Sequence, residues 1–597
     1  MTNNNNKNSI PANVTSYDTG NKPFKHDVGR GKWEKSWDFY AVALSNCFGF
    51  RHFTLLYITL RSNLIIFTFA YMLGMITFLL PLYYTQMFLG QFSSSGIISA
   101  FRISPLFKVI GYISLYLNIM TSCYFVTTAA FPLYIIIESM QSVLPWSHCN
   151  NEFNSINCKT IDDVPKRANE SSIFLHYNTN HSLPIHDYID YLFGYDTQNI
   201  YLWPIMLCAV FVWILIGLVH IKGVEMLGKI FRFITLTSFL CFILITIRVL
   251  CVKETWEALN HLFHFKFASF NNIETLIASP TFFLAAFGAG WGNVLTIASY
   301  NNFKEDIGKL SLVACFIQMI VFIISAIIYK SVDKFLRQYY LFTYMYFGRG
   351  DPMLFTFVCY AGYFSHFSWP NFWTILFFLV IFLTQFSEGA IQILTILTAI
   401  FDEYEYTRIY KRIFLGGLIG FLALISLAFC SSDVFASVFS LYSISGANKL
   451  LIVLMELFVV LWIYGRLRFQ RDVKFMTEIT LKSWKIWMMR FVTPFLTIVS
   501  LLYHVFQGFF FSNYISIFFI FIFLKLLPLI CIPGYMIYKV YAATGGILDR
   551  IRKLCRPTDW FPADPIEHQN YEHYLGNSDI CNELVHDNFE TSDTNHI

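Results

Sequence analysis

The segment TFFLAAFGAGWGNVLTIASYNNF, residues 281–303, decides the fold. It is an apolar run long enough to cross a bilayer, which takes about 20 residues. Gly288, Gly290 and Gly292 lie at its middle, and each glycine lowers helix stability by about 1 kcal/mol relative to alanine. This pattern favours a helix that breaks at membrane depth, where unwound backbone must be buried or line a cavity. Broken helices point to the binding sites of transporters, whereas the alternative is a glycine face packed against a neighbouring helix.

The composition is that of a membrane protein. Charged residues make up 13% of the chain, against about 25% in soluble domains, and the mean hydropathy is +0.52. We therefore predict an all-α integral membrane protein with twelve transmembrane helices. The expected spans are 37–60, 64–88, 107–138, 202–220, 230–251, 276–300, 311–330, 371–400, 413–430, 436–464, 491–511 and 515–540.

Basic residues gather on one side of these twelve spans, which the positive-inside rule assigns to the cytoplasm. We expect a cytoplasmic tail over 1–36, a twelve-span domain over 37–540 and a second cytoplasmic tail over 541–597, which resembles a disordered segment. The net charge of +4 results from the basic residues on the cytoplasmic side. We therefore expect the chain to contact a lipid bilayer and not nucleic acid. The expected location is the plasma membrane.

A large loop over 139–201 is predicted to lie outside. Cys149 and Cys158 have eight residues between them, and an oxidising exterior allows them to form a disulfide. Asn169 and Asn180 begin two N-glycosylation sequons, which predicts a glycosylated loop.

Several motifs occur in a fixed order along the chain. They are Arg30-Gly-Lys-Trp33, Leu89-Gly-Gln-Phe92, the loop segment Leu144–Cys158, Ala298-Ser-Tyr-Asn301, Thr398–Tyr404 and Trp462-Ile-Tyr-Gly465. Together they resemble the neurotransmitter:sodium symporters, as a divergent member, from about residue 30 to about residue 545. The resemblance implies inverted five-helix repeats with broken first and sixth helices, and alternating access around a midplane site.

The resemblance implies two sodium sites, of which this sequence alters the first. Aligned on Arg51, the asparagine ligand of the family becomes Phe48, and the other two side-chain ligands become Ala286 and Gln318. Because sodium needs oxygen ligands, we expect this first site to be absent. The chloride site of animal relatives keeps only Tyr71 and Gln318 as donors, so the resemblance argues against chloride as a co-ion.

The second sodium site keeps its oxygen atoms. The aligned positions are the carbonyls of Ala41 and Leu44 and the side chains of Thr384, Ser387 and Glu388. A carboxylate within a span is costly and is a functional hypothesis. Glu388 could ligate sodium, titrate as a proton site, or pair with a buried base without a role in transport.

The resemblance also assigns gates and a solute pocket. Arg30 and Asp402 match the cytoplasmic gate, whereas Arg51 faces Ser440 where relatives have the aspartate of the outer gate. The residues that match the solute pocket are Val42, Ser45, Tyr124, Phe287, Gly288 and Trp291. Val42 replaces the aspartate of monoamine transporters, which disfavours a monoamine solute.

These expectations describe a transporter and not an enzyme, and we identify no catalytic residues. We expect a secondary active transporter of a small organic solute, a sodium-coupled amino acid symporter. The alternative is a non-transporting relative that acts as a binding or trafficking partner. The altered first sodium site and outer gate favour this alternative, whereas the inner gate, Tyr124 and the three glycines favour transport. A channel-like leak is a third option.

Overall fold

The computed structural model describes residues 24–48, 52–53, 64–160, 163, 182–193, 202–263, 284, 288–339, 352–430, 446–510 and 515–576. These residues form helices and no strands, with one isolated bridge between Cys158 and Ser182. Within them, nine helices are long and apolar enough to cross a membrane. Helices satisfy every backbone hydrogen bond within the segment, which is the requirement that a bilayer imposes. The prediction of an all-α membrane protein is confirmed.

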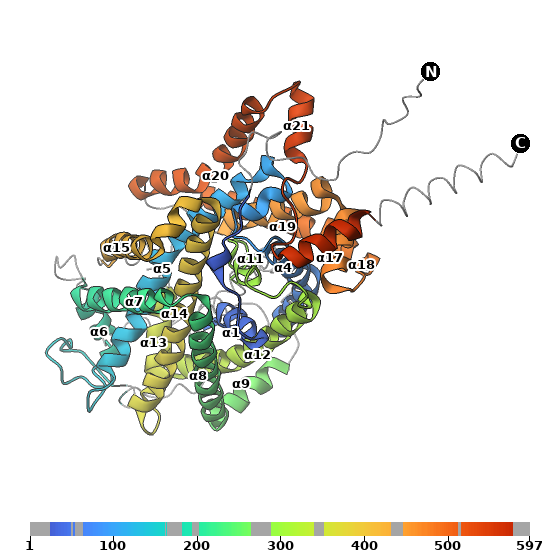
Figure 1. Ribbon diagram of the computed structural model, residues 1–597. Helices are drawn as coiled ribbons and strands as arrows, with labels where there is room; N and C mark the ends of the chain where they lie inside the picture. The colour runs from blue at the N-terminus through green and yellow to red at the C-terminus, as the bar shows by residue number, and fades with distance from the viewer. Residues whose placement is uncertain are drawn as a thin grey trace, which may run out of the picture.

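The helices of the first half run in the expected order. They are α1 (Ser36–Cys47), α3 (Leu64–Gly74), which continues through a π-helical turn (Met75–Leu79) into α4 (Leu80–Ser93), α5 (Val109–Glu138), α6 (Pro184–Phe193), α7 (Trp203–Ile221), α8 (Val224–Leu250), α9 (Lys253–Phe263) and α11 (Asn293–Ala298). Figure 1 shows the short α1 and α11 in the interior, surrounded by longer helices.

The second half begins with α12 (Ile307–Tyr339), α13 (Pro352–Phe364), α14 (Pro370–Glu403) and α15 (Lys411–Ala428). A helical stretch over Gly446–Thr477 follows, with a π-helical turn at Val459–Gly465 and α17 (Arg466–Thr477) at its end. The chain continues with α18 (Ser483–Trp487), a π-helical turn (Met488–Val492), α19 (Thr493–Phe510), α20 (Ile515–Ala542) and α21 (Ile547–Cys555). The long helices α5 and α14 pack side by side and are the most deeply buried of the candidate spans among the described residues.

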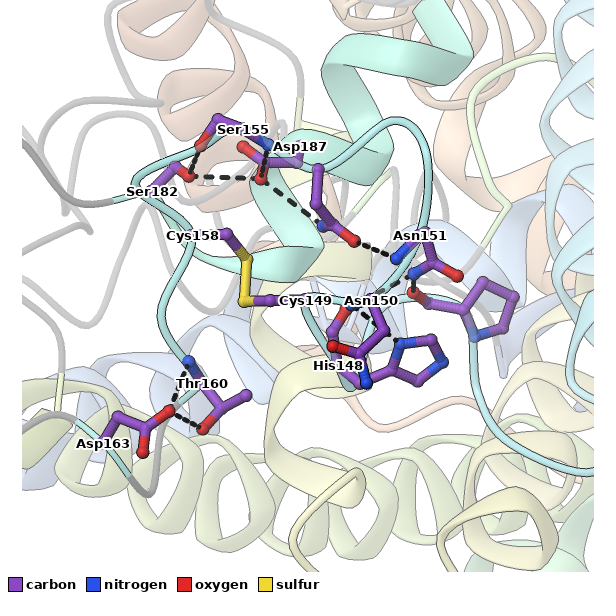
Figure 2. Close-up of a disulfide and its surroundings, with 12 residues drawn as sticks. His148, Cys149, Asn150, Asn151, Ser155, Cys158, Thr160, Asp163, Ser182 and Asp187 are labelled. Carbon is purple, nitrogen blue, oxygen red and sulfur yellow. Dashed lines mark hydrogen bonds between the residues drawn. A yellow bond between two sulfur atoms is a disulfide. The ribbon is translucent and has the colours of Figure 1, made fainter.

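The loop that follows α5 contains the expected disulfide between Cys149 and Cys158, shown in Figure 2. Asp187 at the start of α6 secures the loop, because its carboxylate accepts hydrogen bonds from the Ser155 amide (2.9 Å) and the Ser182 hydroxyl (3.1 Å). The disulfide therefore closes the loop on itself, and the Asp187 carboxylate ties the loop to α6. The predicted glycosylation sites Asn169 and Asn180 lie outside the described residues.

The C-terminal tail corrects an expectation. Although 541–597 resembles a disordered segment, residues 547–576 are folded, with α21 followed by a helix over 565–576. Asp472 of α17 is buried and accepts hydrogen bonds from the Tyr571 hydroxyl (2.9 Å) and the Trp560 indole (3.4 Å). The Trp560 ring also stacks on Phe92, with centroids 5.1 Å apart. The composition of the tail alone does not predict a folded segment. Burial of the Trp560 and Tyr571 rings against the membrane domain stabilises it.

Candidate solute and ion site

The sixth span breaks at its glycines. Gly288, Gly290 and Gly292 have φ of +57°, +87° and +87°, in the left-handed region that side-chain-bearing residues avoid. A Cβ atom at Gly288 would lie 2.4 Å from Nδ2 of Asn46, and one at Gly292 would lie 2.3 Å from Cγ2 of Ile97. Only glycine suits these positions, because a side chain would strain the left-handed backbone and would contact Asn46 or Ile97 too closely. The prediction of a broken helix is confirmed, and α11 starts only at Asn293.

The first span is interrupted at the same place. α1 ends at Cys47, and Phe48 is extended, with φ of −102° and ψ of 111°. The Asn293 side-chain amide lies 3.5 Å from Oδ1 of Asn46, and the Thr395 hydroxyl donates to Asn293 (3.0 Å). These polar contacts join α1, α11 and α14 beside the two helix interruptions. Unwound backbone and amide side chains at such a point are suited to binding a polar solute.

The described residues of the predicted solute pocket are buried in this region. The Trp291 carbonyl accepts a hydrogen bond from the Asn118 side-chain amide (2.6 Å). The Trp291 ring packs edge-on against Phe125, with ring centroids 6.0 Å apart. Tyr124 packs on the same Phe125, with ring centroids 5.2 Å apart. The structure therefore gathers Tyr124 of α5 and Trp291 of the break around one aromatic side chain.

The α1 residues of the predicted pocket, Val42 and Ser45, are also buried. The Ser45 hydroxyl donates its hydrogen to the Val42 carbonyl (2.9 Å), so the lone pairs of this hydroxyl stay available to an ion or solute. Phe287 lies outside the described residues.

Lys449 is a site residue that the sequence reasoning missed. Its ammonium lies 3.5 Å from the centroid of the Trp291 ring, and its Cβ would be 3.1 Å from a Cβ at Gly290. The side chain is 1% exposed. The signal was present in the sequence, because a lysine within an apolar span is rare and marks function by default.

The predicted second sodium site joins two helices that pack together, α1 and α14. The Thr384 hydroxyl donates to the Ile381 carbonyl (2.9 Å) and the Ser387 hydroxyl to the Leu383 carbonyl (2.8 Å), so their lone pairs remain available to a cation. Glu388 is buried, at 3% exposure.

The two carbonyls that α1 would offer to this ion already accept hydrogen bonds. The Ala41 carbonyl accepts one from Thr235 of α8 (2.9 Å), and the Leu44 carbonyl accepts one from the Phe48 amide (2.9 Å). The Leu44 carbonyl keeps a second lone pair, whereas the Ala41 carbonyl lies within α1, where it also faces the Ser45 amide one turn further on. The donor chemistry therefore fits a hard cation such as sodium.

The region of the first sodium site is aromatic. The Phe48 ring packs between Phe239 and Phe242 of α8, with centroids 5.1 and 4.9 Å away. The Gln318 side-chain nitrogen contacts the imidazole of His52, while Ala286 lies outside the described residues. The Tyr71 ring stacks on Phe322 at 4.0 Å.

Arg30 and Asp402 form an ion pair (3.4 Å) whose side chains are 10% and 4% exposed. Asp402 also accepts the Gly96 amide (2.6 Å), and the Arg30 guanidinium lies 4.3 Å over the Tyr300 ring. Burial alone would lower the pKa of Arg30, but the negative charge of Asp402 and the hydrogen bond with Tyr300 outweigh it and raise this pKa. The pair is thus a buried contact and not a surface pair, and losing one partner would leave an uncompensated charge.

Distant motifs converge on this ion pair. The Trp33 indole donates to the Ile297 carbonyl (2.9 Å), and its backbone amide donates to the Tyr300 carbonyl (3.0 Å). The Asn301 amide donates to Gln91 (3.1 Å). The arrangement closes one side of the helix break. Arg51 and Ser440, the predicted outer gate positions, lie outside the described residues.

The N-terminal segment, residues 24–35, rests on the C-terminal one. The Phe24 amide donates to Asp559 (3.0 Å), and the Arg102 guanidinium lies 3.4 Å over the Phe24 ring. Burial, together with the positive charges of Arg102, Arg30, Arg408 and His568, lowers the pKa of His26 to about 3.

The family model described as "Sodium:neurotransmitter symporter family" matches residues 30–543. The sodium- and chloride-dependent glycine transporter 1 of Xenopus laevis is 25% identical over 93% of this chain and 90% of its own length. The sodium- and chloride-dependent neutral and basic amino acid transporter B(0+) is 24% identical in both mouse, over 94% of this chain and 93% of its own, and human, over 97% and 96%.

The names of these relatives state which ions those proteins depend on. The relatives are described as dependent on both sodium and chloride, so sodium is consistent with them. The expectation that chloride is not a co-ion finds no support in these relatives.

Proposed function

Because the chain belongs to the sodium:neurotransmitter symporter family, whose members are transporters and not enzymes, we propose that it is a sodium-coupled symporter of an amino acid. The observation that carries this proposal is the meeting of two interrupted helices, α1 at Phe48 and the sixth span at Gly288. A buried ion pair closes one side of this point. This is the geometry that alternating access requires, a midplane site sealed from one side at a time.

The solute would bind between the two interruptions, against Val42, Ser45, Tyr124, Phe287, Gly288 and Trp291. The ammonium of Lys449 beside Trp291 favours a solute with a carboxylate, since opposite charges attract strongly in a desolvated site. An amino acid meets this requirement, and the glycine and amino acid transporters among the relatives support it.

Sodium would bind at the second site, through the carbonyls of Ala41 and Leu44 and the side chains of Thr384, Ser387 and Glu388. The donor set described above supports this assignment, because it consists of oxygen atoms from two packed helices. We place the protein in the plasma membrane with both termini in the cytoplasm, on the distribution of basic residues.

Uptake of a labelled amino acid mixture by cells with confirmed surface expression tests the proposal. We expect uptake in sodium buffer, none in sodium-free buffer, and a large loss in Glu388→Gln. Uptake driven by acid without sodium would instead make Glu388 a proton carrier. Protein at the surface with no uptake in any buffer would contradict transport and favour a non-transporting relative.

A further inference from the structure

A cavity of about 700 Å³ lies where the helical stretch ending in α17 meets the π-helical turn Met488–Val492 and α21, away from the solute site. Five arginines line it: Arg466, Arg468, Arg490, Arg552 and Arg556. No aspartate or glutamate is among the described residues that line it. Its volume is within the range of ligand pockets, about 300–1,000 Å³. A concave site with such an excess of guanidinium groups is suited to binding a multiply charged anion.

Two helix interruptions bring arginines to the wall of this cavity. The π-helical turn at Val459–Gly465 ends at Gly465, whose φ is +100°. Arg466 and Arg468 follow directly and open α17. Arg490 comes from the second π-helical turn, Met488–Val492. The interruptions of the two helices thus direct arginines from separate spans toward one cavity.

The arginines have few carboxylate partners. Within the described residues, Arg552 has Asp549 at 4.0 Å, an exposed pair, and such pairs contribute little. Arg490 lies 4.0 Å over the Trp462 ring, while its buried Nε has no hydrogen-bond partner among the described residues. Stacking occupies only the face of a guanidinium, so the N–H groups at its edge remain free to bind a phosphate in bidentate fashion.

The surroundings of the cavity indicate a membrane interface. Trp462, Trp484 and Trp487 are all about half exposed, and tryptophan is enriched where lipid headgroups lie. On α21, the exposed Ile547, Leu548 and Ile551 lie beside the basic Arg550 and Arg552, with Asp549 in the first turn. A short helix with apolar and basic residues exposed together is typical of one that lies in the headgroup region. Both features are those expected of a protein surface at headgroup depth.

We propose that the arginine cavity binds the headgroup of an anionic phospholipid that carries phosphate monoester groups. A phosphate monoester offers two negative charges and three acceptor oxygens, which match several converging arginines. Basic pockets on the cytoplasmic side of membrane proteins bind such headgroups. This assignment does not depend on whether the protein transports, because the cavity and the helix break are separate.

The test is binding of short-chain phosphatidylinositol bisphosphate to the full-length protein in detergent, measured by native mass spectrometry. The variants are Arg552→Gln, whose side chain is largely exposed, and the triple variant Arg466→Gln, Arg490→Gln, Arg552→Gln. Arg412→Gln is the control, because Arg412 is exposed on α15 outside the cavity. Phosphatidylcholine and soluble inositol trisphosphate are the comparison ligands.

We expect one bound bisphosphate lipid that phosphatidylcholine does not displace. We expect the dissociation constant to rise about tenfold or more in Arg552→Gln and further in the triple variant, and to be unchanged in Arg412→Gln. Equal binding to all variants, or no preference over phosphatidylcholine, would overturn the proposal. Inositol trisphosphate that binds as tightly as the lipid would overturn the assignment to a lipid. The single variant keeps the test decisive if the triple variant fails to fold.

Discussion

Lys449 places a positive charge at the helix break, next to Trp291. If this ammonium attracts the solute carboxylate, Lys449→Met should raise the KM for the transported amino acid about tenfold or more, because hydrogen bonds to charged groups contribute about 1.5–3 kcal/mol. Uptake kinetics measure this change. Lys222→Met, at an exposed position after α7, is the matched control and should leave the KM unchanged. A wild-type KM in Lys449→Met would contradict the role.

Arg30 and Asp402 should stabilise the folded protein as a pair. Arg30→Gln and Asp402→Asn each leave a buried partner without its counter-charge, at a cost of about 3–5 kcal/mol. The double variant should lose less than the sum of the two, since the two side chains contact each other. Thermal unfolding of the purified variants gives this comparison. Additive losses would show that the pair is not coupled.

At the scale of single residues, the sequence could identify which positions matter but not where their side chains lie. Alignment on Arg51 located Phe48, yet its packing between Phe239 and Phe242 depends on α8, which is far away in the chain. The Arg30–Asp402 contact was expected. The burial of this pair depends on Tyr300 and Gly96, and local sequence patterns do not predict that burial. Lys449 could have been found from its rarity within a span.

At the scale of elements, the break in the sixth span depends on Gly288. Alanine there would place its Cβ 2.4 Å from Asn46 and would pay about 1–2 kcal/mol for a left-handed backbone. We therefore expect Gly288→Ala to lose most uptake at normal surface expression. Gly416→Ala is the control, because Gly416 lies within α15 with no atom near its would-be Cβ. Its uptake should equal that of the wild type, and its helix should gain about 1 kcal/mol.

The N-terminal segment should loosen in acid. The pKa of His26 falls from its ordinary 6.5 to about 3, so this histidine is neutral in both folded and unfolded states above pH 6.5. Between these two pH values only the unfolded segment binds the proton, and stability is therefore lost as the pH falls, by up to about 1.4 kcal/mol per pH unit.

Limited proteolysis of this segment between about pH 7.5 and pH 5 measures the effect. Cleavage should rise as the pH falls in the wild type and rise less in His26→Gln, which has no titrating ring. The same pH dependence in both proteins would exclude His26 as the cause.

Elements could be predicted where the bilayer alone dictates them. Apolar runs such as 107–138 and 202–220 are helical as expected, since a span must satisfy its own backbone hydrogen bonds. The C-terminal segment could not be predicted in this way. Its order comes from Trp560 and Tyr571 meeting Asp472, which is a tertiary contact between polar segments of unremarkable composition.

At the scale of the whole molecule, the N-terminal segment 24–35, the C-terminal segment and the motifs Leu89–Phe92 and Ala298–Asn301 lie on one side of the helix break. The N-terminal segment, the Arg30–Asp402 pair and the C-terminal segment contact one another there. The structure thus describes a molecule closed on that side. Opening on it would require these contacts to separate together, which is a rigid-body movement of bundles and not a local change.

Accumulation of a labelled amino acid in proteoliposomes that contain the purified protein tests the central claim most directly. An inward sodium gradient should drive the amino acid inside above its outside concentration, and a sodium ionophore should abolish the accumulation. Arg30→Gln and Glu388→Gln should both fail to accumulate it. Equilibration without sodium, or no uptake by correctly inserted protein, would contradict sodium-coupled transport.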